Sequence, residues 1–175
     1  MWTLLTLLLC FVEAHPVDEV VQGAYLILAL GEVRLELDVT PGSQVAGALL
    51  KSLDTNADRR ITEAEARAYA GRVLAQSTLA LDGVAVPWRL DKVSVPPYEN
   101  LETGNDILKI YAVAKRPDRT GTHSLSYQNR YQPAKSQWTA NVFLQPTAGW
   151  QYQVTGQQRS DDGRQFTVKY TAGGS

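Results

Sequence analysis

The chain has 175 residues, enough to bury a substantial core in one domain. Its 17 basic and 18 acidic residues nearly balance and form no basic run, so nothing indicates nucleic acid or an anionic membrane surface as a partner. Cys10 is the only cysteine, which argues against a disulfide framework and, if the N-terminus is removed, against thiol catalysis.

The N-terminus resembles a secretory signal. Residues 1–12 are almost wholly apolar, and Val12 and Ala14 are the small or apolar residues that a signal peptidase requires. We predict a signal peptide over 1–14 and a secreted or periplasmic mature chain, 15–175, without a transmembrane segment. No Lys or Arg precedes the apolar run, which departs from the usual pattern. The alternatives are a lipoprotein signal at Cys10 and a retained N-terminal helix or anchor, although the run is too short to span a bilayer.

The mature chain begins with two predicted strands, 20–29 and 32–39, joined at Gly31. In the second, apolar residues alternate with charged ones from Val33 to Val39, as in a strand with one buried face. Pro41 and Gly42 end it. A helical unit over about 43–76 follows, in which we expect Ser43 to cap the first helix. Apolar residues recur at three- and four-residue steps on both sides of a polar loop.

That loop, 54–65, has the spacing of an EF-hand calcium loop. Ca²⁺ is a hard cation that takes six to eight oxygen ligands, and EF-hands supply them from loop positions 1, 3, 5, 7, 9 and 12. Here these positions are Asp54, Asn56, Asp58, the backbone carbonyl of Arg60, Thr62 and Glu65. Ile61 is the apolar residue expected at position 8. We therefore predict one calcium site.

Two features weaken this interpretation. Position 6 is Arg59, where EF-hands use Gly for a sharp turn, and the adjacent arginines reduce the negative charge of the loop. The alternatives are that Thr62 and Glu65 form only a capping box at the start of the second helix, or that the loop binds another metal.

The rest of the chain is predicted to be strands. Residues 79–81 and 84–90 flank Asp82-Gly83, a two-residue hairpin turn. We predict a loop over 99–105, followed by two neighbouring antiparallel strands, 106–114 and 122–131. Three more strands are predicted at 138–144, 150–156 and 164–171. A hairpin turn at 161–163 joins the last two. About nine short strands indicate a mainly β fold, an antiparallel β-sandwich or open barrel, with the helical unit inserted.

Aromatic residues are frequent in the later strands. They suggest either a carbohydrate platform or, as we favour, core and cross-strand packing: Trp138, Phe143, Trp150, Tyr152, Phe166 and Tyr170.

Several segments resemble a bacterial family: 14–16 (AHP), 35–42 (LELDVTPG), 54–70 and 79–83 (LALDG). They are similar to the extracytoplasmic N-terminal domain of nickel/cobalt-exporter-like, hydrogenase-accessory-like membrane proteins, over about residues 14–88. The resemblance implies an exported β-rich domain with a single EF-hand-type insertion. In those relatives a multi-helix membrane region follows. Here either the domain is free-standing or the membrane part is missing from this chain, so only the pattern of Asp54, Asn56, Asp58, Thr62 and Glu65 carries over.

We therefore expect an exported calcium-binding β-domain, structural or partner-binding, and not an enzyme, because neither a serine-nucleophile elbow nor a zinc-protease helix occurs. A glycosidase, which needs a pair of carboxylates, stays open as the enzymatic alternative, although no spacing singles out such a pair. The alternative is a periplasmic accessory domain of a nickel, cobalt or copper export system with a membrane-protein partner. A mature N-terminal His15 together with His123 suggests a Cu²⁺ site, since imidazole and amine nitrogens suit that ion. The competing interpretation is that the two histidines are unrelated surface residues.

Overall fold

The computed structural model describes residues 16–174; the predicted signal peptide and His15 lie outside the described residues. The described chain is mainly β. Its strands are β1 (Val20–Ala29), β2 (Glu32–Pro41), β3 (Ser77–Leu81), β4 (Val84–Val86), β5 (Arg89–Ser94), β6 (Leu108–Lys115), β7 (Gly121–Asn129), β8 (Ser136–Leu144), β9 (Gln151–Arg159) and β10 (Gln165–Gly173). Its helices are α1 (Ala46–Leu53), α2 (Glu63–Leu74) and α3 (Tyr98–Thr103).

The strands form two five-stranded sheets. Sheet A has the order β5-β6-β2-β1-β8 and sheet B the order β4-β3-β7-β10-β9. Every pairing is antiparallel except that of β1 with β8, which is parallel. The prediction of a mainly β, antiparallel-rich chain is therefore confirmed.

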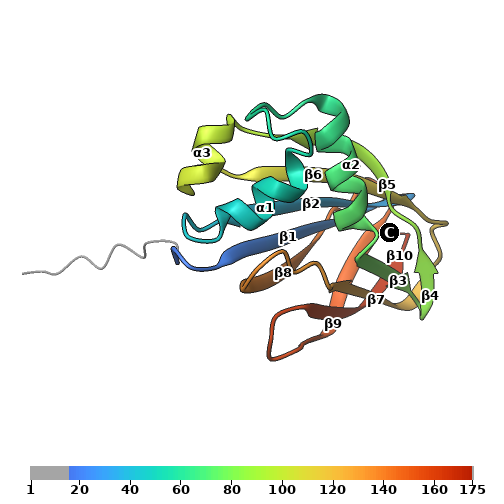
Figure 1. Cartoon of the computed structure of the whole chain (residues 1–175). Coiled ribbons are helices and arrows are strands. Elements are labelled where there is room, and N and C mark those ends of the chain that lie inside the picture. The colour runs from blue at the N-terminus through green and yellow to red at the C-terminus, as the bar shows by residue number, and fades with distance from the viewer. Residues whose placement is uncertain (1–15, 175) are drawn as a thin grey trace, which may run out of the picture.

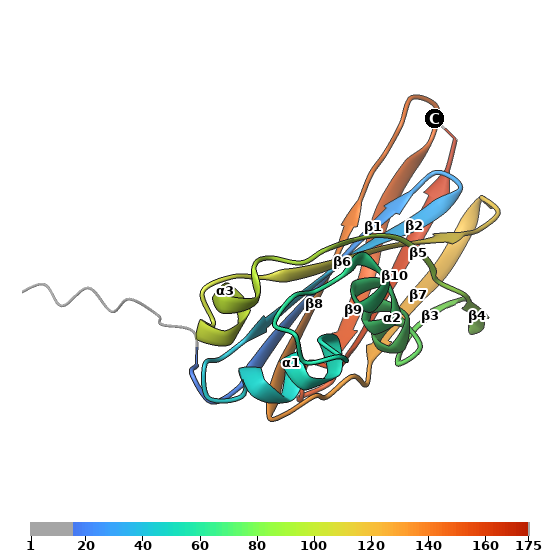
Figure 2. The same ribbon diagram turned by 45° about the horizontal axis from the view of Figure 1, so that its top comes forward.

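A single core cluster joins the two sheets and the helices. Alternate residues of β1 and β2 point into it, as the period-two pattern predicts, among them Leu26, Leu28, Val33, Leu35 and Leu37. The helices gather over one part of the sheets, and the β1–β2 turn extends away from them (Figures 1 and 2). Leu49 and Leu53 of α1 and Val73 of α2 reach the same core.

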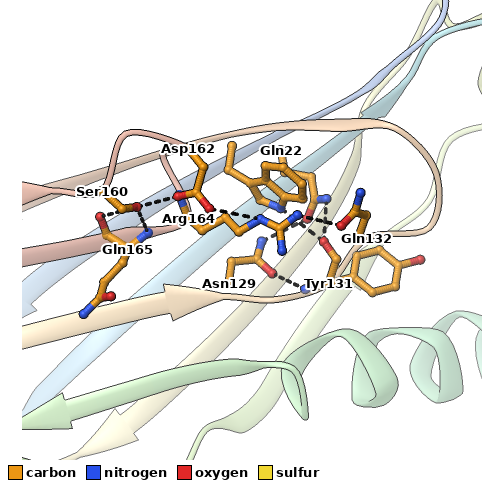
Figure 3. Close-up of polar contacts among 9 residues, drawn as sticks. Gln22, Asn129, Tyr131, Gln132, Ser160, Asp162, Arg164 and Gln165 are labelled. Atoms are coloured by element: carbon orange, nitrogen blue, oxygen red, sulfur yellow. Dashed lines mark hydrogen bonds and ion pairs between the residues drawn. The ribbon is translucent and has the colours of Figure 1, made fainter.

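A buried polar group links the sheets. Gln22 of β1 accepts a hydrogen bond from Asn129 of β7 (2.9 Å) and donates one to the carbonyl of Tyr131 (3.0 Å), as Figure 3 shows. The Asn129 side chain in turn accepts from the Tyr131 amide (2.9 Å). Because a buried amide left without partners is costly, this group fixes how β1 and β7 face each other.

Both predicted hairpin turns are present. Asp82 and Gly83 have φ of 50° and 79°, and they join β3 to β4. The turn at 161–163 joins β9 to β10, with Gly163 at φ 73°.

Three local predictions are wrong. Ser43 does not cap α1: the N-cap is Val45, and the Gly42 carbonyl accepts the amide hydrogens of Val45 and Ala46. Residues 84–90 are not one strand. They divide at Pro87, which cannot donate to a strand ladder, so β4 stays in sheet B and β5 joins sheet A.

The segment predicted as a loop, 99–105, contains most of α3, which ends at Gly104 in the left-handed conformation (φ 74°). One fully buried residue, Leu101, anchors this short helix, too little apolar pattern to be recognised in the sequence. The strands β6 and β7 are also not neighbours. β6 pairs with β2 and β5, whereas β7 pairs with β3 and β10.

Candidate functional site

The predicted loop connects two helices as expected. Asp54 is the C-cap of α1 and Thr62 the N-cap of α2, so positions 1 to 12 run from the end of one helix into the first turn of the next. The apolar faces of both helices are buried, which fixes the two ends of the loop.

Asp54 organises the first half of the loop. It is 6 % exposed, and its carboxylate accepts the backbone N–H groups of Asp58 (3.3 Å) and Arg59 (2.9 Å). The loop therefore folds back over the carboxylate of Asp54, its first residue.

Asn56 and Asp58 form local turns at positions 3 and 5. The Asn56 side-chain oxygen accepts the Asp58 amide hydrogen (3.1 Å), and Asp58 accepts that of Arg60 (2.8 Å). The Asn56 amide also donates to the Asp58 carboxylate (3.0 Å). Both side chains are exposed and carry oxygen atoms on the same short segment.

Glu65 closes the loop. One carboxylate oxygen accepts from the amide (3.0 Å) and hydroxyl (2.8 Å) of Thr62, and the other from the amide (2.8 Å) and hydroxyl (2.9 Å) of Thr55. Thr62 accepts the Glu65 amide hydrogen in return, so the capping box that was the alternative interpretation of this segment is present. The bonds from Thr62, followed by those from Thr55, lower the pKa of Glu65 to about 2, so this carboxylate is ionised at neutral pH.

Arg59, at position 6, has φ of 64°, the left-handed conformation that Gly adopts most easily. Its guanidinium donates two hydrogen bonds to Glu102 of α3 (3.1 and 2.9 Å) and lies 4.6 Å from the ring centre of Tyr98. The bond from Arg59 lowers the pKa of Glu102. Sequence reasoning missed both partners, which lie about forty positions away and carry no motif.

The candidate metal ligands of the loop are all oxygen atoms, which suit Ca²⁺ or Mg²⁺ rather than softer metals. Within residues 16–174, however, no three His, Cys, Asp or Glu side chains are grouped so that they could hold a metal ion. Asp54, Asp58 and Glu65 instead bind amide and hydroxyl groups of the loop itself.

Of the two histidines in the predicted copper site, His123 is among the described residues and His15 lies outside them. The ring of His123 already faces Asp82 through Nδ1 (2.8 Å) and the carbonyl of Arg119 through Nε2 (3.0 Å). The copper hypothesis stays a prediction.

Most of the aromatic residues in the later strands pack against other side chains. Phe166 and Tyr170 are buried in the core, and Tyr152 contacts Tyr170 edge to face. Arg164 covers the ring of Trp138 at 3.8 Å. Phe143 is the exposed exception, at 53 %.

Comparison with protein-family models and with curated proteins finds no match to this sequence.

None of the helices within residues 16–174 is both long and apolar enough to cross a membrane.

Proposed function

We propose that residues 54–65 form an EF-hand-type Ca²⁺ loop, and that the protein is an exported calcium-binding β-domain whose ion stiffens the helical insertion. The ion would be held by Asp54, Asn56, Asp58, the carbonyl of Arg60, Thr62 and Glu65. A hard divalent cation bound by these oxygens would offset two of the three negative charges of the carboxylates and hold α1 and α2 in a fixed relation.

One observation carries the proposal: the backbone at Arg59 is left-handed while the Asp54 carboxylate accepts its amide hydrogen. A capping box needs only Thr62 and Glu65, and does not require a side-chain-bearing residue to adopt a conformation that costs roughly 1–2 kcal/mol. The sharp turn at position 6 is what a calcium loop needs to bring positions 1, 3 and 5 together.

Binding requires Glu65 to exchange its threonine donors for the ion. The competition with these four hydrogen bonds, together with the arginine at position 6, favours weak affinity, with a dissociation constant of about 10⁻⁴ to 10⁻³ M, the range of extracellular modules.

Calorimetric titration of the protein with Ca²⁺ and Mg²⁺ tests this proposal. The discriminating variant is Glu65→Gln, because Gln still completes a capping box but cannot give a bidentate carboxylate. The matched control is Glu63→Gln, in the same first turn of α2 but outside the ligand positions. We expect Glu65→Gln to weaken Ca²⁺ binding at least about tenfold, and Glu63→Gln to leave it nearly unchanged.

Circular dichroism of both variants checks that the fold is retained. If no saturable heat develops up to ~10 mM Ca²⁺, well above the weakest EF-hand range, the segment is a capping box only. Equal binding by the two variants would likewise remove Glu65 from the ligand set.

A further inference from the structure

A groove of about 540 Å³ lies between the C-terminal half of α2, the β3–β4 hairpin and the start of β5. The helix α2 packs against β3 and β5 at this place (Figures 1 and 2). We call it the Trp88 groove, after the aromatic residue in its wall. It shares no residue with the 54–65 loop, so it is independent of the calcium site.

The groove exists because the chain changes sheets at Pro87. Proline cannot donate to a strand ladder, so the pairing of β4 with β3 ends there, and β5 pairs with β6 in the other sheet. The side of α2 that faces the crossing segment carries small residues, Gly71 and Ala75, which do not fill the space. A Cβ added at Gly71 would meet no atom of the neighbouring elements within 4 Å, so the space beside this residue is open.

The wall of the Trp88 groove is apolar and uncharged. None of the described residues that line it is ionisable. The indole nitrogen of Trp88 is enclosed by the protein, so any part of this ring that faces the groove is carbon. The hydroxyl of Ser77 donates to the Val73 carbonyl (3.3 Å), which leaves Thr78 as the other polar side chain of the wall. The larger apolar side chains of the wall are Leu74, Leu79, Val86, Pro87, Trp88 and Leu90.

The charged residues that are nearest to the wall in the sequence do not contribute to it. Arg72 of α2 donates to a backbone carbonyl of α1. Arg89, whose side chain lies on the opposite face of β5 from that of Leu90, pairs with Asp91 (4.0 Å). Arg67 lies about one helical turn before the part of α2 that lines the groove. The wall therefore supplies no counter-charge to a ligand.

The volume and the wall together select the class of ligand. Sites for small organic molecules typically have volumes of about 300–1,000 Å³, and this groove lies within that range. A charged ligand would lose hydration here without gaining an ion pair, whereas an apolar ligand gains by leaving water. We propose that the Trp88 groove binds an uncharged, largely apolar small molecule, which packs against Val86, Trp88 and Leu90 and occupies the space beside Gly71.

The test compares N-phenyl-1-naphthylamine with 1-anilinonaphthalene-8-sulfonate, two probes that differ by one sulfonate and fluoresce more strongly in apolar surroundings. Titration of the protein into the uncharged probe should give a saturable rise in fluorescence, with a dissociation constant of about 0.1 mM. We expect the sulfonate to bind at least about fivefold more weakly, because the wall offers it no cation. ¹H–¹⁵N NMR should place the shifts at the amides of 71–79 and 85–90 and at the indole of Trp88.

Gly71→Leu is the informative variant, because its side chain enters the open space, and it should weaken binding of the uncharged probe at least about tenfold. Leucine favours a helix more than glycine does, so the variant should fold normally. Gly47→Leu is the matched control. It makes the same change at an exposed position of α1 outside the groove, also with no atom within 4 Å of the added Cβ, and should bind as the parent protein does.

Four results would overturn the proposal. They are the absence of a saturable signal with the uncharged probe, binding of the sulfonate as tight as that of the uncharged probe or tighter, unchanged binding by Gly71→Leu, and NMR shifts that fall outside the groove.

Discussion

At the scale of single residues, the pKa of Glu65 reflects how strongly hydrogen bonds organise the loop. Its pKa is about 2, lowered from 4.5 by the bonds from Thr62 and Thr55. Because the folded-state pKa is the lower one, the carboxylate stabilises the fold above pH 4.5, and that contribution is lost as the pH falls toward 2. We expect the amides at the start of α2 to lose hydrogen-exchange protection within this window.

Carbon-detected NMR of the Glu65 carboxyl gives its pKa, and Thr62→Ala is the informative variant. It removes the hydroxyl bond from Thr62, the second-largest cause of the shift, and keeps the amide bond, which is the largest. The pKa of Glu65 should therefore rise part of the way toward 4.5, and the lost N-cap should cost about 1 kcal/mol of stability at pH 7. A Glu65 that titrates at its ordinary value in the parent protein would contradict this account of the loop.

Replacement of Arg59 has two opposing effects on the stability of the fold. Replacement by Gly relieves the left-handed backbone by roughly 1 kcal/mol, but removes the exposed pair with Glu102, worth about 0–1 kcal/mol. We expect Arg59→Gly to change the free energy of unfolding by less than about 1 kcal/mol and to tighten Ca²⁺ binding, since Gly is the residue EF-hands use there.

Arg60→Gly serves as the control for Arg59→Gly, because it removes the same charge from the neighbouring position, where the backbone φ is not positive. Calorimetry should then show tighter binding for the first variant than for the second. If both tighten binding equally, the charge of the arginines and not the turn limits the affinity.

At the scale of elements, the β9–β10 turn depends on a glycine. Gly163 has φ of 73°, and a Cβ added there would overlap the carbonyl oxygen of Trp138 on β8. The neighbouring Asp162 accepts the Arg164 amide hydrogen (3.0 Å), so the turn has little freedom to shift (Figure 3). We expect Gly163→Ala to destabilise the protein by more than about 2 kcal/mol, measured by urea denaturation.

Substitutions at two other glycines separate the backbone cost of Gly163→Ala from the cost of its contact with Trp138. Gly83 has φ of 79° but open space around its Cβ position, so Gly83→Ala should cost only the backbone term of about 1–2 kcal/mol. Gly47 is exposed within α1 and has no atom within reach of an added Cβ, so Gly47→Ala should stabilise by about 0.5–1 kcal/mol. A Gly163→Ala cost no larger than that of Gly83→Ala would show that the Trp138 contact does not matter.

The elements that were predicted well are those specified by local chemistry. The alternating residues of β1 and β2 and the Asp82-Gly83 turn depend on neighbours within a few positions. The capping box of Thr62 and Glu65, which was the alternative interpretation of the loop, is equally local. By contrast, α3 is specified mainly by the burial of Leu101 and by the left-handed Gly104, a signal too short to distinguish it from a loop.

At the scale of the whole molecule, strand partners were the least predictable feature. The strands β6 and β7 follow each other along the chain but lie in different sheets, and β8 returns to pair in parallel with β1. Such pairings depend on how both sheets bury their apolar faces together, which no single segment encodes. For the same reason the pair between Arg59 and Glu102 could not be predicted from the sequence. The predicted signal peptide and the resemblance to an exporter-associated domain remain predictions.

The contact between the sheets gives the last prediction. Gln22 is 1 % exposed and is the partner that the side chain of Asn129 donates to across the sheets (Figure 3). Gln22→Leu keeps a similar volume but leaves this buried donor without its acceptor, whereas the Tyr131 carbonyl keeps a bond from Trp138 (3.1 Å). We expect a loss of about 1–3 kcal/mol in the free energy of unfolding.

Gln158→Leu, the same change at an exposed position of the edge strand β9, should alter stability by less than about 0.5 kcal/mol. The double variant Gln22→Leu with Asn129→Leu removes the donor as well as the acceptor, so its cost should be smaller than the sum of the two single costs by about 0.5–3 kcal/mol. Strictly additive losses in urea denaturation would mean that the two amides act independently, and that apolar packing alone holds the sheets in register.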